Sequence, residues 1–163
     1  MNGSQALTAA INSSNTIVQM YLGDITEDEL FVRAVPGINH LAWQLGHLVE
    51  SEHNLIGMSC PGSMPALPAD FAGKYSKETA TSDDRSAFHS KAQLQAAMEQ
   101  QRAGTLAILA KLSDADLDQP GPEQFRSFCP TVGDLFALIG THWTMHAGQW
   151  AVLRRKLGRA PLM

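Results

Sequence analysis

The chain has 163 residues, 44% of them hydrophobic and 17% charged, with a formal net charge of −4, which fits one globular domain over residues 1–163. The acidic balance gives no broad attraction for nucleic acid or an anionic membrane surface, and no apolar run reaches the about 18 residues of a membrane span. The N-terminus lacks a signal-peptide pattern, so we expect a cytoplasmic protein that binds neither nucleic acid nor membrane. Cys60 and Cys129 are expected to be free thiols.

The first helix is predicted over residues 4–22. Leu7, Ile11 and Val18 recur there at helical spacing and define one apolar face. A capping-box pattern at residues 26–29 then predicts a short helix. A Pro-Gly pair follows and breaks the chain before the next long element.

The second helix is predicted over residues 39–58, where leucines at helical spacing share one face. Residues 59–84 are rich in Pro, Gly, Ser and Asp and are too long for a simple turn between helices. We expect this segment to cross the end of a helix bundle. Phe71 and Tyr75 are the aromatic residues expected to anchor it.

The third helix is predicted over residues 84–112, which are rich in Ala, Gln and Leu. His89, near its start, is expected on the surface. A short helix is predicted at residues 113–117, and the fourth long helix over residues 131–157 with Thr131 as its N-cap. With no segment of strand periodicity, the pattern predicts an all-α four-helix bundle with one or two long crossovers.

His142 and His146 are the strongest functional signal in the sequence. They lie four residues apart, so they share one face of the fourth helix, inside its apolar stripe. A single core histidine is usually satisfied by a local hydrogen bond. Local hydrogen bonds explain two core histidines on one helix face less well. Charging either imidazole there would be costly, whereas a metal ion would bind both in their neutral form. The spacing therefore indicates a metal site, with two locally bonded structural histidines as the alternative.

A third ligand is sought in the second helix, which carries His40, His47 and His53. The face of His47 is polar, so it either faces solvent or lines a cleft against the fourth helix; the spacing leaves both open. Glu50 and His53 form a Glu-x-x-His pair, the ligand motif of di-iron carboxylate bundles. The fourth helix has no Glu and the third has only Glu99, which disfavours a di-iron site.

Three tryptophans, Trp43, Trp143 and Trp150, are interpreted as core residues, with an apolar pocket wall as the alternative. The sequence contains no Gly-rich phosphate loop, nucleophile elbow or His-Glu-x-x-His motif. These absences disfavour nucleotide hydrolases, serine esterases and zinc proteases of the common types.

Two segments of the chain resemble the DinB-like (DinB/YfiT) superfamily. Residues 36–50 are similar to the Trp-x-x-Gly-His segment of its second helix. Residues 142–158 are similar to its His-x-x-x-His-x-Gly-Gln segment, followed by Leu-Arg-Arg-x-Leu-Gly, on the fourth helix. The helix order and the long crossover extend the resemblance over most of the chain.

The resemblance implies an up-down-down-up four-helix bundle with the long crossover between helices 2 and 3, often as a homodimer. It implies a divalent metal ion, commonly nickel or zinc, held by His47, His142 and His146. The family includes metal-dependent hydrolases and transferases that use thiols such as bacillithiol or mycothiol, so a thiol and an electrophilic substrate are expected. The alternative is a non-catalytic dimer whose histidine cluster is a structural or sensory metal site.

Two further residues are candidates for the chemistry. Gln149 lies one turn beyond His146 and is placed to orient a ligand or a water on the metal. Glu50 lies one turn beyond His47 and is a candidate base or hydrogen-bond partner of a ligand. The alternative for both is a plain surface position.

Overall fold

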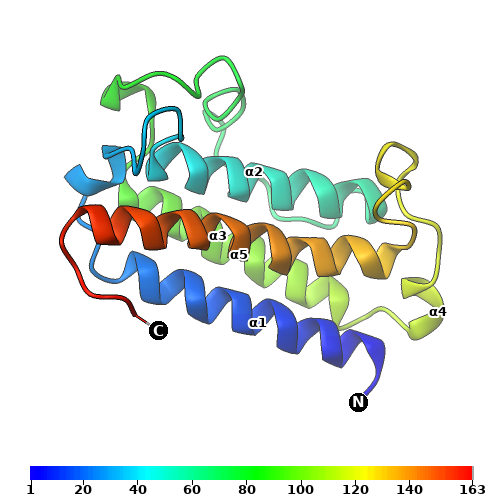
Figure 1. Ribbon diagram of the computed structural model, residues 1–163. Helices are drawn as coiled ribbons and strands as arrows, with labels where there is room; N and C mark the ends of the chain where they lie inside the picture. The colour runs from blue at the N-terminus through cyan, green and yellow to red at the C-terminus, as the bar shows by residue number, and fades with distance from the viewer. Residues whose placement is uncertain (163) are drawn as a thin grey trace.

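Four long helices lie side by side in the computed structural model, which describes residues 1–162 (Figure 1). They are α1 (Gly3–Leu22), α2 (Leu41–Ser59), α3 (Lys91–Leu109) and α5 (Val132–Lys156). The shorter elements are η1 (Asp28–Phe31), η2 (Arg85–Ala87), α4 (Asp114–Leu117) and η3 (Glu123–Phe125). The described residues form no β-strand, only an isolated bridge between Pro120 and Thr131. The predicted all-α class is confirmed.

Side-chain caps fix where the helices begin. Asn2, Ser90 and Thr131 each form a capping box with the third residue of the helix that follows. Each such cap stabilises its helix by about 1 kcal/mol. The predicted N-cap role of Thr131 is confirmed. At the other end of α5, Gly158 takes the left-handed conformation, with φ of 74°, that glycine adopts without strain.

The predicted start of the third helix is wrong. The sequence pattern places it at Asp84, but Asp84 caps only the short turn η2, accepting a hydrogen bond from the backbone N–H of Ser86. Phe88 is then extended, and α3 begins after the capping box of Ser90 with Gln93. A second cap a few residues downstream has therefore divided what composition alone reads as one helix.

His89 is buried, so its predicted surface position is also wrong. Its Nδ1 accepts a hydrogen bond from the Tyr75 hydroxyl at 2.7 Å, and its Nε2 lies 3.2 Å from Asp70. The ring stacks on Phe71 with 5.0 Å between the ring centroids. Burial raises the pKa of Tyr75 to about 12, which keeps its hydroxyl proton available to His89. These contacts tie the long crossover to the start of α3.

The crossover between α2 and η2 runs back along the bundle, so the prediction that it crosses the end is wrong. Pro65 packs on Gly104, near the C-terminal end of α3, whereas Tyr75 lies on Gly46, near the start of α2. The predicted anchoring role of Phe71 and Tyr75 is confirmed, since their exposed fractions are 1% and 2%. The crossover therefore covers one side of α2 that the sequence pattern leaves open to solvent.

A buried carboxylate joins three of the helices. Glu52 of α2 accepts hydrogen bonds from Arg102 and Thr105 of α3 and from the indole N–H of Trp143 of α5, at 3.0, 2.7 and 2.8 Å. The guanidinium of Arg102 also lies over the Trp143 ring. Because a buried charge is stable only when it is paired and hydrogen-bonded, this cluster fixes how α2, α3 and α5 meet.

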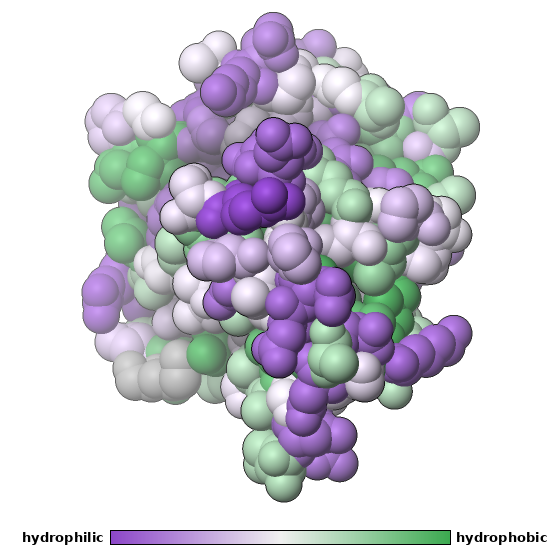
Figure 2. Space-filling model, turned by 90° about the vertical axis from the view of Figure 1, so that its right-hand side faces the viewer, coloured by the Kyte–Doolittle hydropathy of each residue, from purple (hydrophilic) through white to green (hydrophobic). Residues whose placement is uncertain are grey.

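The end of the bundle near the N-terminus has a mixed surface. Figure 2 shows hydrophilic residues gathered over the centre of this end and hydrophobic residues in small separate groups towards its margins. Over residues 1–162, the helices are all too short or too polar to cross a membrane.

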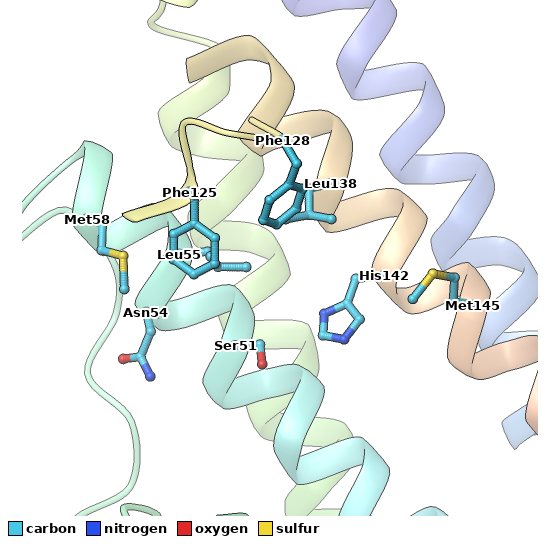
Figure 3. Close-up of a pocket in the computed structure, with 9 residues that line it drawn as sticks. All are labelled: Ser51, Asn54, Leu55, Met58, Phe125, Phe128, Leu138, His142 and Met145. Carbon is cyan, nitrogen blue, oxygen red and sulfur yellow. The ribbon is translucent and has the colours of Figure 1, made fainter. Parts of the chain in front are cut away.

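A pocket of about 480 Å³ opens between the C-terminal half of α2, the η3 segment and α5 (Figure 3). Its walls include Leu55 of α2, Phe125 of η3 and Leu138 of α5. His142 stands at one side of it. The pocket therefore adjoins one of the two histidines that the sequence singles out.

The packing of Tyr75 on Gly46 predicts that Gly46→Ala destabilises the protein. A Cβ at this position would lie 2.1 Å from the Tyr75 ring, so the ring or the helix would have to shift. We expect the free energy of unfolding to fall by about 1–3 kcal/mol, measured by urea denaturation.

Gly57→Ala is the matched control on the same helix. A Cβ there meets nothing within 4 Å, so the gain in helix propensity is expected to raise the stability by up to about 1 kcal/mol. Equal effects of the two substitutions would show that the crossover does not pack on α2 at Gly46.

Candidate metal centre

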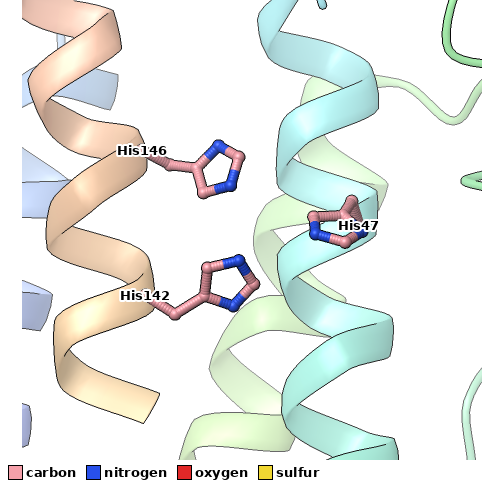
Figure 4. A group of neighbouring side chains, drawn as sticks. All are labelled: His47, His142 and His146. Carbon is pink, nitrogen blue, oxygen red and sulfur yellow. The ribbon is translucent and has the colours of Figure 1, made fainter. Parts of the chain in front are cut away.

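Three half-buried imidazoles from two helices meet between α2 and α5 (Figure 4). His142 and His146 project from α5 towards α2, and His47 of α2 faces them. One ring nitrogen of each lies within 4.8 Å of the others, and the ring centroids are 5.1–5.7 Å apart. Small rotations of such rings would bring three nitrogens to a single ion, and three histidines are one of the ligand sets of catalytic zinc sites.

The polar face of α2 is turned into the protein, towards α5. Trp43 and Gln44 on that face are buried, with exposed fractions of 6% and 3%, and His47 is half-buried. Of the two alternatives that the spacing left open, the prediction that His47 faces solvent is therefore wrong. The structure has His47 facing α5. The crossover covers α2 from one side and α5 covers it from the other.

Gln44 sets the proton position on His146. Its Oε1 lies 2.9 Å from both His146 Nδ1 and the indole Nε1 of Trp150, while its Nε2 donates to the carbonyl of Asn39. An indole nitrogen can only donate, so the oxygen of the amide must face it. Nδ1 of His146 must then carry the hydrogen, which leaves the lone pair on Nε2. That lone pair is the one free to bind a metal ion.

Trp43 holds the His47 ring from the opposite side. The two rings stack with 4.9 Å between centroids and 9° between planes. The Trp43 indole N–H donates to the Ser76 carbonyl and the Thr79 hydroxyl, both in the crossover. All three tryptophans are buried with a bonded indole N–H, which confirms their interpretation as core residues.

The three imidazoles are neutral near pH 7. Burial lowers the pKa of His47, His142 and His146, because the charged form loses hydration that the interior does not replace. For His142 and His146 the pKa falls to about 4, with the neighbouring imidazoles adding to the effect of burial. Neutral imidazole is the form that binds metal ions, so the cluster needs no deprotonation at pH 7.

The other histidines of the second helix lie outside the cluster. His40 is the N-cap of α2: its Nδ1 accepts from the backbone N–H of Trp43. His53 is hydrogen-bonded to Gln101 of α3 at 3.0 Å. Among the described residues no carboxylate joins the three-histidine group.

Gln149 and Glu50 are both half-buried, and their roles remain predictions. The side chain that bonds to the cluster is Gln44, which the sequence pattern did not single out. Its place one turn before His47, on the same face of α2, is the signal that could have identified it. Glu52 was also missed, because its three partners lie on other helices.

Comparison with known proteins gives a family and a fold. Residues 13–150 match the family described as the DinB superfamily. A crystal structure described as that of a conserved protein from Enterococcus faecalis is 14% identical, with a TM-score of 0.69 over 98% of this chain and 99% of that chain. At this identity the likeness is one of fold. A search of curated proteins finds no match.

The lowered pKa values predict that the metal-free protein loses stability as the pH falls from about 6.5 towards about 4. In this range the unfolded histidines, with ordinary pKa values near 6.5, bind protons that folded His142 and His146 do not. Protons therefore favour the unfolded chain. Urea denaturation midpoints measured between pH 7 and pH 4 would test this.

A variant with both His142→Gln and His146→Gln provides the comparison. It lacks the two groups that titrate, so its midpoint should fall less over the same pH range. Parallel pH profiles of the two proteins would contradict the assignment.

Proposed function

The chain belongs to the DinB superfamily, and from this premise we propose that it is a metal-dependent enzyme of the thiol S-transferase or hydrolase type. His47, His142 and His146 would hold the divalent ion. The observation that carries the proposal is the meeting of three neutral imidazoles, within 4.8 Å of one another, beside a pocket. A purely structural histidine would need only a hydrogen-bond partner and no such convergence.

The donor set fits nickel or zinc. Three neutral imidazole nitrogens suit both ions, and three protein ligands leave coordination positions open for exogenous groups. The fixed proton on Nδ1 of His146 supports the same conclusion, since it directs Nε2 to the ion. We propose nickel or zinc because the resemblance to the DinB-like superfamily implies these ions, and the donor set suits both.

The bound ion would supply a Lewis acid that lowers the pKa of a water or thiol. The chain contributes the surroundings of that chemistry. Gln44 holds His146 in the binding tautomer, and Trp43 fixes the plane of His47. We propose that Gln149 orients the substrate by hydrogen bonds and that Glu50 accepts a proton from the nucleophile.

The proposal extends to topology, assembly and location. We propose an up-down-down-up bundle over a single domain, with a homodimer as the working unit in the cytoplasm. Figure 1 supports the topology: α1 and α5 run from the end with the N-terminus, and α2 and α3 run towards it. Substrates would be a small-molecule thiol and an electrophile, or water and a hydrolysable ester or amide.

Metal binding is the first prediction of this proposal. Titration with nickel or zinc, followed by calorimetry, should give one ion per chain, and His142→Ala with His146→Ala should abolish binding. Gln44→Met should weaken the affinity by about 10–100-fold, because the ring of His146 loses its acceptor.

His53→Ala is the control for this titration. It removes a histidine from the same helix that lies outside the cluster and bonds to Gln101, so metal content should stay as in the wild type. An equal, near-zero metal content per chain in the wild type and the double variant would contradict the proposed metal site.

Turnover separates the enzyme from a structural or sensory metal protein. We expect the nickel- or zinc-loaded protein to conjugate an electrophile with bacillithiol, glutathione or coenzyme A, or to hydrolyse an ester or amide, and the double histidine variant to be inactive in both assays. Thermal stabilisation by the metal, without turnover in either assay, would favour the non-catalytic alternative.

A further inference from the structure

The pocket beside His142 differs in character from the imidazole cluster that it adjoins. It has a volume of about 480 Å³, within the range of small-molecule sites. Leu55 and Leu138 line it from two helices, and none of the described side chains that line it is charged. A charged ligand entering it would lose hydration and would meet no charged side chain in the lining.

Three large hydrophobic side chains surround its opening. Met58, Phe128 and Met145 have exposed fractions of 42%, 58% and 59%, and all three line this one pocket. Figure 3 places the two methionines on opposite sides, with the phenylalanine rings between them. Exposed apolar residues that cluster mark binding sites, and methionine adapts its shape to different apolar ligands.

The aromatic wall of the pocket is already in place. Phe125 and Phe128 pack edge to face with 5.8 Å between ring centroids. The backbone N–H groups of Phe128 and Cys129 donate to the Phe125 carbonyl, and Gln124 contacts the Met58 sulfur at 3.1 Å. The η3 segment is therefore held by its own turn hydrogen bonds and contacts α2 at Met58, which places the two phenylalanine rings along one side of the pocket.

The polar groups of the pocket indicate which way a ligand would lie. His142 belongs both to the pocket lining and to the three-histidine cluster. Ser51, also in the lining, follows His47 by one turn on α2 and so lies on the same face. One side of the pocket is therefore shared with the candidate metal centre, and the rest of its surface is chiefly apolar.

We propose that this pocket binds the apolar body of a small uncharged substrate, an aryl or branched-alkyl electrophile, with its reacting group at the His142 side. The inference rests on the proposed function, for which it names the substrate class. Specificity would come from the absence of charge in the lining, since the apolar walls accept many shapes of similar size.

Two fluorescent probes that share one skeleton test the charge preference. N-phenyl-1-naphthylamine is uncharged, and 8-anilinonaphthalene-1-sulfonate adds a sulfonate to the same anilinonaphthalene frame. We expect the uncharged probe to bind the purified full chain at one site, at least tenfold more tightly than the sulfonate. Equal or tighter binding of the sulfonate would overturn the proposal.

Variants at the opening locate the probe. Phe128→Asp and Met145→Lys replace exposed side chains, so the fold should persist, as circular dichroism would check. Each should weaken binding of the uncharged probe at least tenfold. Met20→Lys is the matched control, because Met20 is a 40% exposed methionine on α1 that does not line the pocket. Unchanged affinity in all three variants would contradict the assignment.

The same measurements separate the pocket from the metal site and from an interface between copies. Probe binding that persists when a titration finds no metal would support the pocket and contradict the proposed function. A wild-type dimer that binds no probe, and that Phe128→Asp converts to a monomer in sedimentation velocity, would show that a second copy covers the opening. That outcome would overturn the proposal.

Discussion

A buried polar side chain needs a hydrogen-bond partner, and α2 carries several of them into the interior. This constraint governs the site. Gln44 pairs with His146 and Trp150 of α5, and Glu52 pairs with Arg102, Thr105 and Trp143. These hydrogen bonds form together only when α2 meets α5 and α3 at one rotation and one register. The polar residues that interrupt the apolar pattern of α2 therefore align His47 with the histidines of α5.

The crossover supplies the second half of that alignment. Without the crossover, the outer side of α2 would face water, and the indole N–H of Trp43 would lack its two hydrogen-bond acceptors in the protein. The Ser76 carbonyl and the Thr79 hydroxyl receive that N–H, and Tyr75 fills the space that Gly46 leaves. The crossover, which has no regular secondary structure, thus forms one wall of the site. Aromatic side chains hold it in place, and no regular backbone hydrogen bonding is needed.

The sequence predicts the helices and the α5 histidines well because both depend on local periodicity. His142 and His146 share a face whatever the tertiary structure does. His47 required resemblance to a family, since its own helix reads as polar and its neighbours in space lie far along the chain. Gln44, His89 and the path of the crossover were missed or misplaced for the same reason. Their partners are distant in sequence, and no periodicity records a contact between Gln44 and His146 or between His89 and Tyr75.

The position of the cluster has a mechanical meaning. His47 and the two α5 histidines are far apart in the sequence, so a shared ion would close a loop of on the order of 100 residues. Such a cross-link restricts the unfolded chain in the way a disulfide does, in a sequence whose two cysteines are free thiols. Binding of the ion would then add to the free energy of unfolding, and removing the ion would take this cross-link away from the seam between α2 and α5.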